Sequence, residues 1–448
     1  MFSEGQRLLE GAFRLDHSTS IADLGSLFVR HEDKPLNRLK RTLAEAYGVV
    51  WSFPSTHGTT GLNILALLSA CRAGGRVLVG RDAHSSVTAA MIHGGFHPVY
   101  VVPPYDPGLG LSLGLTLEGV QAVLDREPVD CIVLTSPTYF GIVGELGDII
   151  GLARARGIPV IVDGAHAPHF HFCDDLPPGA EDLGADCVTQ STHKVATALS
   201  QGSLLLINNE RLIDPLYEHV NDLGLVSTSF SYPILASIEL GVRQLVLDGD
   251  ALWKEAIAQA EAFRWGCRRF EGVGCFGRER IGPSGFRDFD PTRVTLDLSH
   301  TGFTGFEIAA ALHEVRVYPE MATLQHVLFL LTPGTMADDI EQVLRALEHV
   351  LRQRRRGRVE VPPPPPLPSI AVTPRAAKFA PKHASSLREA VGRVSGDTIA
   401  TYPPGSPILA AGEVISKEAV EYLQYMKRHG AVLRGASDPT FETMKVLS

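Results

Sequence analysis

The segment Pro159-Val160-Ile161-Val162-Asp163 is the stretch that best indicates the fold. It is a short, continuous run of mostly β-branched residues that ends in a carboxylate. It lacks the alternation of apolar and polar residues that marks a strand with one face in water. Four more apolar runs share this character and also predict buried strands. They lie at residues 76–80, 98–102, 131–135 and 203–207.

Helix-length segments, such as 117–126 and 148–156, separate these runs. Alternation of strands and helices predicts right-handed crossovers and a mainly parallel sheet with helices on both faces, which is the α/β class. In such sheets ligands bind beyond the carboxyl ends of the strands. Residues that carry chemistry are therefore expected directly after each apolar run.

The composition excludes several classes of protein. The 448 residues are 44% hydrophobic and 20% charged, which predicts a globular protein with sizeable cores. With 41 basic and 50 acidic residues the net charge is −9, so we expect no nucleic-acid partner. The sequence has no apolar run of ~18 residues and no recognisable leader, so we expect no membrane span and no secretion. Six cysteines without a C-x-x-C pair predict a reduced, cytoplasmic protein.

Five segments are predicted along the chain. The prolines from Pro362 to Pro366 cannot continue a helix and indicate a stiff linker. A long helical stretch at 233–270, interrupted near Gly249, leads to a β-α-β-α pattern between 292 and 351. The predicted segments are an N-terminal arm at 1–50, a large domain at 51–250, a small α/β domain at 251–360, a proline-rich linker at 361–369 and a C-terminal α+β domain at 370–448.

Lys194 is the strongest candidate for a catalytic residue. It ends the segment Thr189-Gln190-Ser191-Thr192-His193-Lys194, between two stretches that are predicted to be buried. A bare ammonium group is costly there, whereas a lysine that forms an imine with an aldehyde is neutral and nucleophilic. Ser191, Thr192 and His193 could hold a phosphate through their hydroxyl and imidazole groups.

Asp163 lies at the end of a predicted strand, about 30 residues before Lys194. A carboxylate in this position could cap the local backbone or bind magnesium. It could also pair with the pyridinium nitrogen of pyridoxal 5′-phosphate, a cofactor that acts as an electron sink. The combination of Asp163 with an imine-forming lysine favours this third role.

Two further segments could face the same ligand. Ser55-Thr56-His57-Gly58-Thr59-Thr60-Gly61 opens a predicted helix at 62–70. Backbone N–H groups and hydroxyls at the start of a helix form an anion site. His84 follows the strand at 76–80 and could stack on a flat ring, or it could be an ordinary loop histidine.

Two competing chemistries fit the sequence less well. A cluster behind Asp163 has side chains of the kinds that bind zinc or iron, namely His166, His169, His171, Cys173 and Asp174. Its spacing matches neither H-E-x-x-H nor paired cysteines, so we expect no metal. The sequence has no G-x-S-x-G elbow, so a serine hydrolase is not expected.

From about residue 35 to the C-terminus, these residues resemble the fold-type-I, pyridoxal-phosphate-dependent ornithine/lysine/arginine decarboxylases of the aspartate aminotransferase superfamily. The resemblance implies that Lys194 is the Schiff-base lysine and that Asp163 pairs with the pyridine nitrogen. It also implies that Ala165 and His84 lie on the two faces of the ring. The implied phosphate contacts are Gly58, Thr59, Thr60, Ser191 and His193.

Three more segments match the family. Thr135-Ser136-Pro137-Thr138-Tyr139 resembles a segment at a strand end beside the site. Ser229-Phe230-Ser231-Tyr232-Pro233 resembles a segment that often reaches the site from a neighbouring subunit, which implies a homodimer or larger oligomer with shared active sites. Tyr402-Pro403-Pro404-Gly405, together with Gly412-Glu413, resembles the signature of the C-terminal domain.

The chain also departs from the family. We find no Pro-Gly-His-Lys segment near the N-terminus and no wing domain, and the usual Asp-Glu/Ser-Ala-His run is Asp163-Gly164-Ala165-His166. These departures leave open which amino acid is the substrate.

The expected activity is the decarboxylation of arginine, lysine or ornithine to carbon dioxide and an amine that serves as a polyamine precursor. Oxidative deamination, transamination or a lyase step on a related amino acid is the alternative. A non-catalytic protein is disfavoured by the set of Lys194, Asp163 and His84. Lys194 or His166 is expected to return the proton to Cα. The C-terminal domain could supply an acidic group for the cationic end of the substrate across a dimer interface, with Glu413 as the candidate, and otherwise Glu413 is a residue at a helix start.

Overall fold

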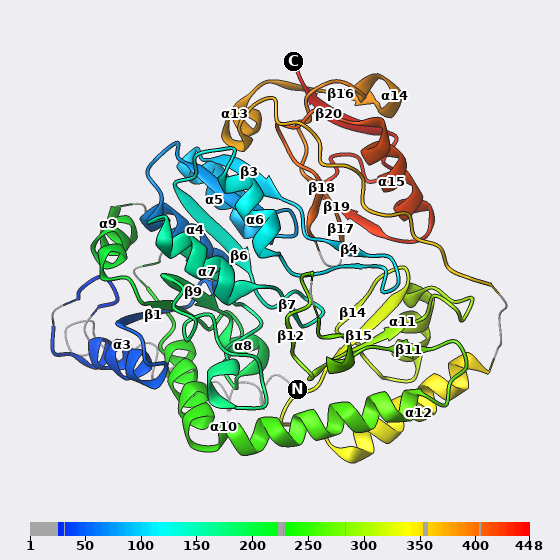
Figure 1. The fold of residues 1–448 in the computed structure, drawn as a ribbon, viewed down its shortest axis with the longest axis horizontal. Helices are drawn as coiled ribbons and strands as arrows, with labels where there is room; N and C mark the ends of the chain where they lie inside the picture. The colour runs from blue at the N-terminus through cyan, green and yellow to red at the C-terminus, as the bar shows by residue number, and fades with distance from the viewer. Residues whose placement is uncertain are drawn as a thin grey trace, which may run out of the picture.

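The computed structural model describes residues 26–30, 32–222, 227, 229–282, 284–352, 357–402 and 405–448. Most of the predicted N-terminal arm, and Pro403 and Pro404 of the C-terminal signature, therefore lie outside the described residues. A seven-stranded sheet forms the large unit (Figure 1). Its strands, in spatial order, are β1 (Trp51–Ser55), β10 (Ser203–Ile207), β9 (Cys187–Gln190), β8 (Val160–Asp163), β6 (Cys131–Thr135), β2 (Arg76–Gly80) and β3 (His97–Val101).

Five neighbouring strands of this sheet, from β9 to β3, run parallel, whereas β10 and β1 are antiparallel to their neighbours. The predicted α/β class with a mainly parallel sheet is confirmed. All five predicted strands are present, as β2, β3, β6, β8 and β10. Strands β1 and β9 were not predicted, because serines and Pro54 interrupt the apolar character of β1 and half of β9 is the polar pair Thr189-Gln190.

Helices pack around the sheet, and α4 contacts the strands β8, β9 and β10. Helix α4 begins at Gly58 rather than at the predicted residue 62. The helices of the large unit are α3 (Pro35–Ala46), α4 (Gly58–Ala70), α5 (Ser85–Gly94), α6 (Leu117–Leu124), α7 (Leu146–Ala155), α8 (Thr192–Val195) and α9 (Ile213–Asp222). Two short ribbons lie nearby, β4 (Tyr105–Asp106) with β5 (Leu111–Ser112), and β7 (Ile142–Val143) with β12 (Asp288–Phe289).

Helix α10 (Tyr232–Cys267) is continuous over 36 residues, so the predicted interruption near Gly249 is wrong. The glycine is there for close packing, not to end the helix. A side chain at Gly249 would place its Cβ 3.0 Å from Phe172 Cβ and 3.3 Å from the Phe172 carbonyl oxygen. The first part of α10 contributes to the core of the large unit, and its last turns contribute to a separate core.

That second core belongs to a small unit around a four-stranded antiparallel sheet, at the lower right of Figure 1. Helix α11 begins with a capping box between Thr304 and Glu307. The elements of the small unit are β11 (Gly274–Cys275), β13 (Arg293–Asp297), α11 (Gly305–Glu314), β14 (Met321–Ala322), β15 (His326–Leu330) and α12 (Ala337–Leu351).

A C-terminal unit with its own apolar core lies at the top of Figure 1. The three cores follow one another along the chain, and the predicted division into domains stays a prediction. The elements of the C-terminal unit are α13 (Pro374–Phe379), β16 (Lys382–Ser386), α14 (Leu387–Ala390), β17 (Ile399–Tyr402), β18 (Pro407–Leu409), α15 (Lys417–Arg428), β19 (Val432–Arg434) and β20 (Thr443–Leu447).

An ion pair joins the C-terminal unit to the large sheet. Arg81, just after β2, donates to both carboxylate oxygens of Glu413 at 2.5 and 2.9 Å. The Glu413 side chain is 2% exposed, and it also accepts from the backbone N–H of Ala410 at 2.7 Å. A buried pair with this geometry is costly to break, because the remaining charge has no partner.

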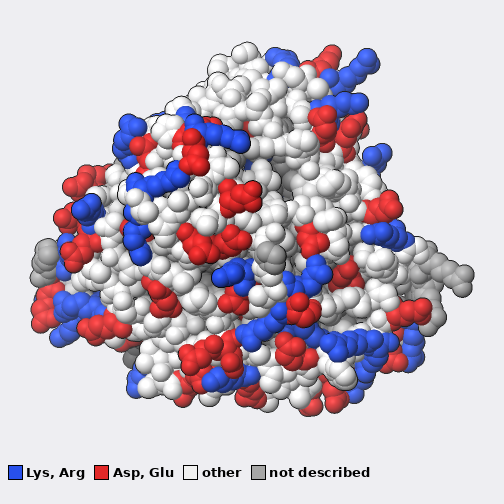
Figure 2. Space-filling view, in the orientation of Figure 1, with Lys and Arg blue, Asp and Glu red and all other residues white. Residues whose placement is uncertain are grey.

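On the face drawn in Figure 2, acidic and basic side chains are interspersed and no single sign covers the surface. Among the described residues, no helix combines the length and the apolar character that crossing a bilayer requires.

The Arg81–Glu413 pair gives a test of how the C-terminal unit is held. We expect Glu413→Gln to lower the free energy of unfolding by about 3–5 kcal/mol, because the Arg81 guanidinium stays buried without its counter-charge. Hydrogen exchange should show lost protection in α15. The control is Glu421→Gln, which removes an exposed pair with Lys417 and should change stability by about 0.5 kcal/mol or less. Equal stability of the two variants would show that this pair does not hold the unit.

Candidate active site

A cavity of about 1540 Å³ opens at the carboxyl ends of the parallel strands, where the three units meet. Its wall includes the ends of β6, β8 and β9 and the start of α4. Residues 320–326 of the small unit, the proline-rich segment 361–368 and residues 406–408 of the C-terminal unit complete it.

Ten of the residues predicted from the sequence for catalysis or cofactor binding line this cavity, whereas Thr192 does not. They are Gly58, Thr59, Thr60, His84, Asp163, Ala165, His166, Ser191, His193 and Lys194. The structure therefore brings these residues together, while the role of each stays a prediction.

Lys194 lies in the short helix α8, directly after β9, and its Nζ atom is 3.0 Å from His166 Nε2. The other ring nitrogen of His166, Nδ1, lies 3.1 Å from an Nη2 donor of Arg293. The Arg293 side chain is 1% exposed and is held by Asp290, which it contacts at 3.2 Å. Three basic side chains thus follow one another from the small unit into the cavity.

This order of contacts fixes where the protons lie. An arginine can only donate, so His166 Nδ1 accepts and the neutral ring carries its proton on Nε2. That N–H points to Lys194 Nζ, which can accept only as a neutral amine. Burial, with Arg293 and Lys194 next, holds the pKa of His166 well below its usual value. Burial also lowers the pKa of Lys194, with Asp163 opposing and Arg293 reinforcing the shift. The geometry therefore favours a neutral, nucleophilic Lys194.

Asp163 ends β8 and is held in place by two donors. Its Oδ2 accepts from Asn63 Nδ2 at 2.8 Å, and its Oδ1 accepts from the Ala165 N–H at 3.1 Å. Asn63 is itself oriented by Thr189 Oγ1, which donates to Asn63 Oδ1 at 2.6 Å. Each carboxylate oxygen keeps capacity for another hydrogen bond, so Asp163 could accept the N–H of a protonated pyridine ring.

The start of α4 has the features of an anion site. Gly58 has φ +66°, a conformation that favours glycine, and the N-cap residue His57 makes no side-chain bond to the helix. The hydroxyls of Thr59 and Ser191 are hydrogen-bonded to each other across the cavity wall. His193 Nδ1 donates to the Gly202 carbonyl at 2.7 Å. A phosphate here would meet backbone N–H groups and two hydroxyls.

The space between Asp163 and the start of α4 suits a flat ring. His84 lines it, and the N–H of Ser86 donates to His84 Nδ1, while Nε2 makes no hydrogen bond to a described residue. Thr135 Oγ1 is buried in the wall without a partner in the described chain. An imine-forming lysine, a carboxylate for a ring nitrogen and a phosphate site in one cavity fit pyridoxal phosphate.

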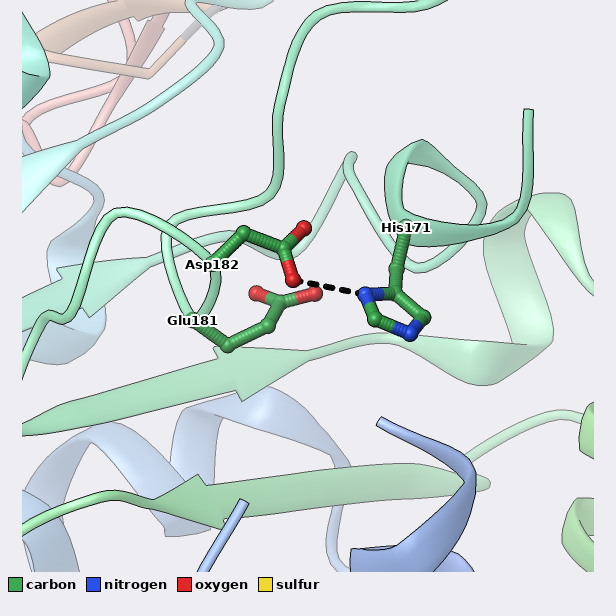
Figure 3. A group of neighbouring side chains, drawn as sticks. All are labelled: His171, Glu181 and Asp182. Atoms are coloured by element: carbon green, nitrogen blue, oxygen red, sulfur yellow. Dashed lines mark hydrogen bonds and ion pairs between the residues drawn. The ribbon is translucent and has the colours of Figure 1, made fainter. Parts of the chain in front are cut away.

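The histidine cluster noted in the sequence does not converge. His166 faces Lys194, His169 Nε2 lies 3.6 Å from Asp290, and His171 Nδ1 lies 2.7 Å from Asp182 Oδ1. Within the described residues, His171, Asp182 and Glu181 have ligand atoms close enough to share an ion (Figure 3). They lie outside the cavity wall, and the absence of a metal at the site stays a prediction.

Two other expectations can be compared with the structure. Glu413 does not line the cavity, and the proposal that it binds the substrate is wrong for this arrangement, because Arg81 occupies both its oxygens. Its alternative role at a helix start is wrong as well, since α15 begins at Lys417. Ser229 and Ser231 line the cavity of their own chain.

The sequence analysis missed Asn63, Arg293 and Glu320. Asn63 was detectable as a polar residue within the apolar helix 62–70. Arg293 begins a strand of the small unit and Glu320 precedes another, and no local pattern links either residue to Lys194.

Comparison with known proteins yields consistent matches. The family model Orn/Lys/Arg decarboxylase, major domain, matches residues 6–339, and the model of the C-terminal domain matches residues 365–441. An arginine decarboxylase of Bacillus subtilis is 31% identical over 410 residues, which cover 90% of this chain and 84% of that protein. The structure of the constitutive lysine decarboxylase of Escherichia coli matches with a TM-score of 0.79 at 23% identity, over 98% of this chain and 76% of that one. An SPT N100Y variant solved with PLP matches with a TM-score of 0.56 at 16% identity, over 77% and 82%. The fold is that of the fold-type-I enzymes.

The assignment of Lys194 can be tested by trapping. When the protein is mixed with pyridoxal phosphate and reduced with borohydride, we expect mass spectrometry to find the cofactor on the Lys194 peptide. Because the pKa of Lys194 is lowered, labelling should proceed at a lower pH than labelling of free lysine. Lys40 is an internal control, since burial lowers its pKa to about 7 but it lies outside the cavity. Label on Lys40, or unchanged visible absorbance in Lys194→Ala, would contradict the assignment.

Proposed function

The chain belongs to the Orn/Lys/Arg decarboxylase family, and we propose that it decarboxylates arginine to agmatine and carbon dioxide. The protein is a pyridoxal-phosphate-dependent amino-acid decarboxylase, and the relatives support a basic amino acid as its substrate. The choice of arginine rests on the name of the 31% identical relative. The observation that carries the chemistry is the buried Lys194, held against His166 in the same cavity as Asp163.

Each residue has a distinct task in this proposal. Bound pyridoxal phosphate supplies the electron sink for the pair released when carbon dioxide leaves. Asp163, fixed by Asn63 and Ala165, holds the proton on the ring nitrogen. The start of α4 and Ser191 bind the phosphate, and His84 covers one face of the ring.

The proton that returns to Cα comes from Lys194 Nζ rather than from His166, after the Lys194 amine has taken up a proton that the α-ammonium group of the substrate releases. A neutral imidazole that donated its Nε2 proton would become an anion. The imidazolium form is opposed because Arg293 donates to Nδ1. His166 instead orients the lysine amine through its N–H. The proline-rich segment and the C-terminal unit form part of the cavity wall and would limit the access of water to the site.

An end-point assay tests this function. Cofactor-loaded protein is incubated separately with arginine, lysine and ornithine, and carbon dioxide and the amine are measured. We expect stoichiometric agmatine and carbon dioxide from arginine, at a higher kcat/KM than for the other two. Lys194→Ala should lose this activity by several orders of magnitude. A different preferred substrate would overturn the choice of arginine. Ammonia or a keto acid without carbon dioxide would contradict decarboxylation itself.

We also propose a homodimer with shared active sites in the cytoplasm. Three apolar side chains are exposed on α10 and on the loop packed against it, namely Leu240 (61%), Leu247 (66%) and Leu199 (52%). The N–H of Leu199 donates to Ser237 of α10, one turn before Leu240, and the next residues, Ser200 and Gln201, line the cavity. In a two-fold symmetric homodimer, a second copy of the chain that covers these residues would lie next to the active sites of both chains. All six cysteines are free, as in a reducing compartment.

Analytical ultracentrifugation tests the dimer. The wild type should sediment as a dimer, and Leu247→Glu should shift it toward the monomer, because a carboxylate would be buried in the interface. Val315→Glu is the control, since Val315 is also exposed but lies on the small unit. A monomeric wild type, or equal effects of the two substitutions, would count against this interface.

A further inference from the structure

The cavity has few groups that could bind a positive charge. Among the described residues, its carboxylates are Asp82, Asp163 and Glu320. Asp163 is engaged by Asn63 and the backbone at the end of β8. Burial raises the pKa of Asp82 to about 6, so this carboxylate loses its charge below that pH, whereas its charge is largely kept at pH 7. Glu320 is exposed at the cavity wall, and no described residue forms an ion pair with it.

Glu320 is held in a defined position. Its backbone N–H donates to the Leu328 carbonyl at 2.9 Å, next to the pairing of β14 with β15. Its Oε1 accepts from the Tyr139 hydroxyl at 2.6 Å. The other oxygen makes no hydrogen bond to a described residue. One hydrogen bond thus orients the carboxylate and leaves capacity for a cationic donor.

Three contacts in series connect Glu320 to Lys194. Tyr139 holds Glu320, and the Tyr139 ring lies against the His166 ring with centroids 4.6 Å apart. His166 in turn contacts Lys194 Nζ at 3.0 Å. Glu320 is also one of the charges that act on the Lys194 amine, whereas Asp82 is not. The carboxylate therefore lies to one side of the reaction centre, beyond the Tyr139 and His166 rings.

We propose that Glu320 binds the cationic end of the substrate side chain and that Tyr139 positions it. This inference rests on the proposed function, in which the α-amino end of a basic amino acid is held near Lys194. The side chain then extends along the Tyr139 ring, and its guanidinium or ammonium group meets the free oxygen of Glu320. A carboxylate without a cationic partner favours a cation and disfavours a neutral side chain of the same length.

Glu320→Gln is the central test, with arginine and its neutral isostere citrulline as substrates. We expect KM for arginine to rise by about tenfold or more while kcat changes by about twofold or less, because the lost contact is to the part of the substrate that does not react. The preference for arginine over citrulline, as a ratio of kcat/KM, should fall by a similar factor. Glu320→Asp should keep part of the preference. Tyr139→Phe should raise KM by a smaller factor.

Calorimetry of agmatine binding to the cofactor-loaded protein adds a readout that does not depend on turnover. Its affinity should fall in Glu320→Gln and stay unchanged in the control Glu314→Gln, which removes an exposed carboxylate at the end of α11. One outcome is that the wild type decarboxylates a basic amino acid and Glu320→Gln keeps the wild-type KM for arginine, the preference for arginine over citrulline and the affinity for agmatine. In that case this inference is wrong and the proposed function stands. If the wild type releases no carbon dioxide from any basic amino acid, the proposed function fails first.

Discussion

The site depends on one constraint of the fold, the shared carboxyl edge of the parallel strands. Strands β6, β8 and β9 lie side by side in the same direction, so the residues that follow them meet at one edge. This edge brings together Thr135, Asp163 and Ser191, which are separated by tens of residues along the chain. Everything else at the site is placed relative to that edge, including the start of α4 and the segments from the other two units.

At this edge, the positions of the protons on His166 and Lys194 determine which group is nucleophilic. Arg293 reaches the site from the small unit and can act only as a donor, so it imposes a single neutral tautomer on His166. That tautomer presents an N–H to Lys194 and stabilises the free amine. Arg293 thus favours the neutral amine of Lys194 through His166, without touching Lys194 itself. Burial of these side chains strengthens the effect.

The sequence was sufficient for the parts of the site that are local. Lys194 and Asp163 follow β9 and β8 directly, so their chemistry could be inferred from strand ends and from the cost of a buried ammonium. Residues from other units could not be found in this way, because nothing near Arg293 or Glu320 in the chain indicates a partner more than a hundred residues away.

Errors arose where tertiary packing overrode a local rule. Gly249 was expected to interrupt a helix, as glycine often does, but the structure uses it to bring α10 against Phe172. Glu413 was expected to face the substrate, but the large sheet supplies Arg81 as its partner. Both outcomes depend on contacts between distant segments, which a pattern in one stretch of sequence does not encode.

Helix α10 has a mechanical consequence. At 36 residues it is a rod about 54 Å long, with one end in the core of the large unit and the other in the core of the small unit. Because the helix is unbroken and each end is packed into a core, it links the two units without a joint among its own residues. Arg293 begins β13 and Glu320 directly precedes β14, so a tilt of the small unit would move both residues together. Such a tilt would change the basicity of Lys194 and the affinity for a cationic substrate side chain together.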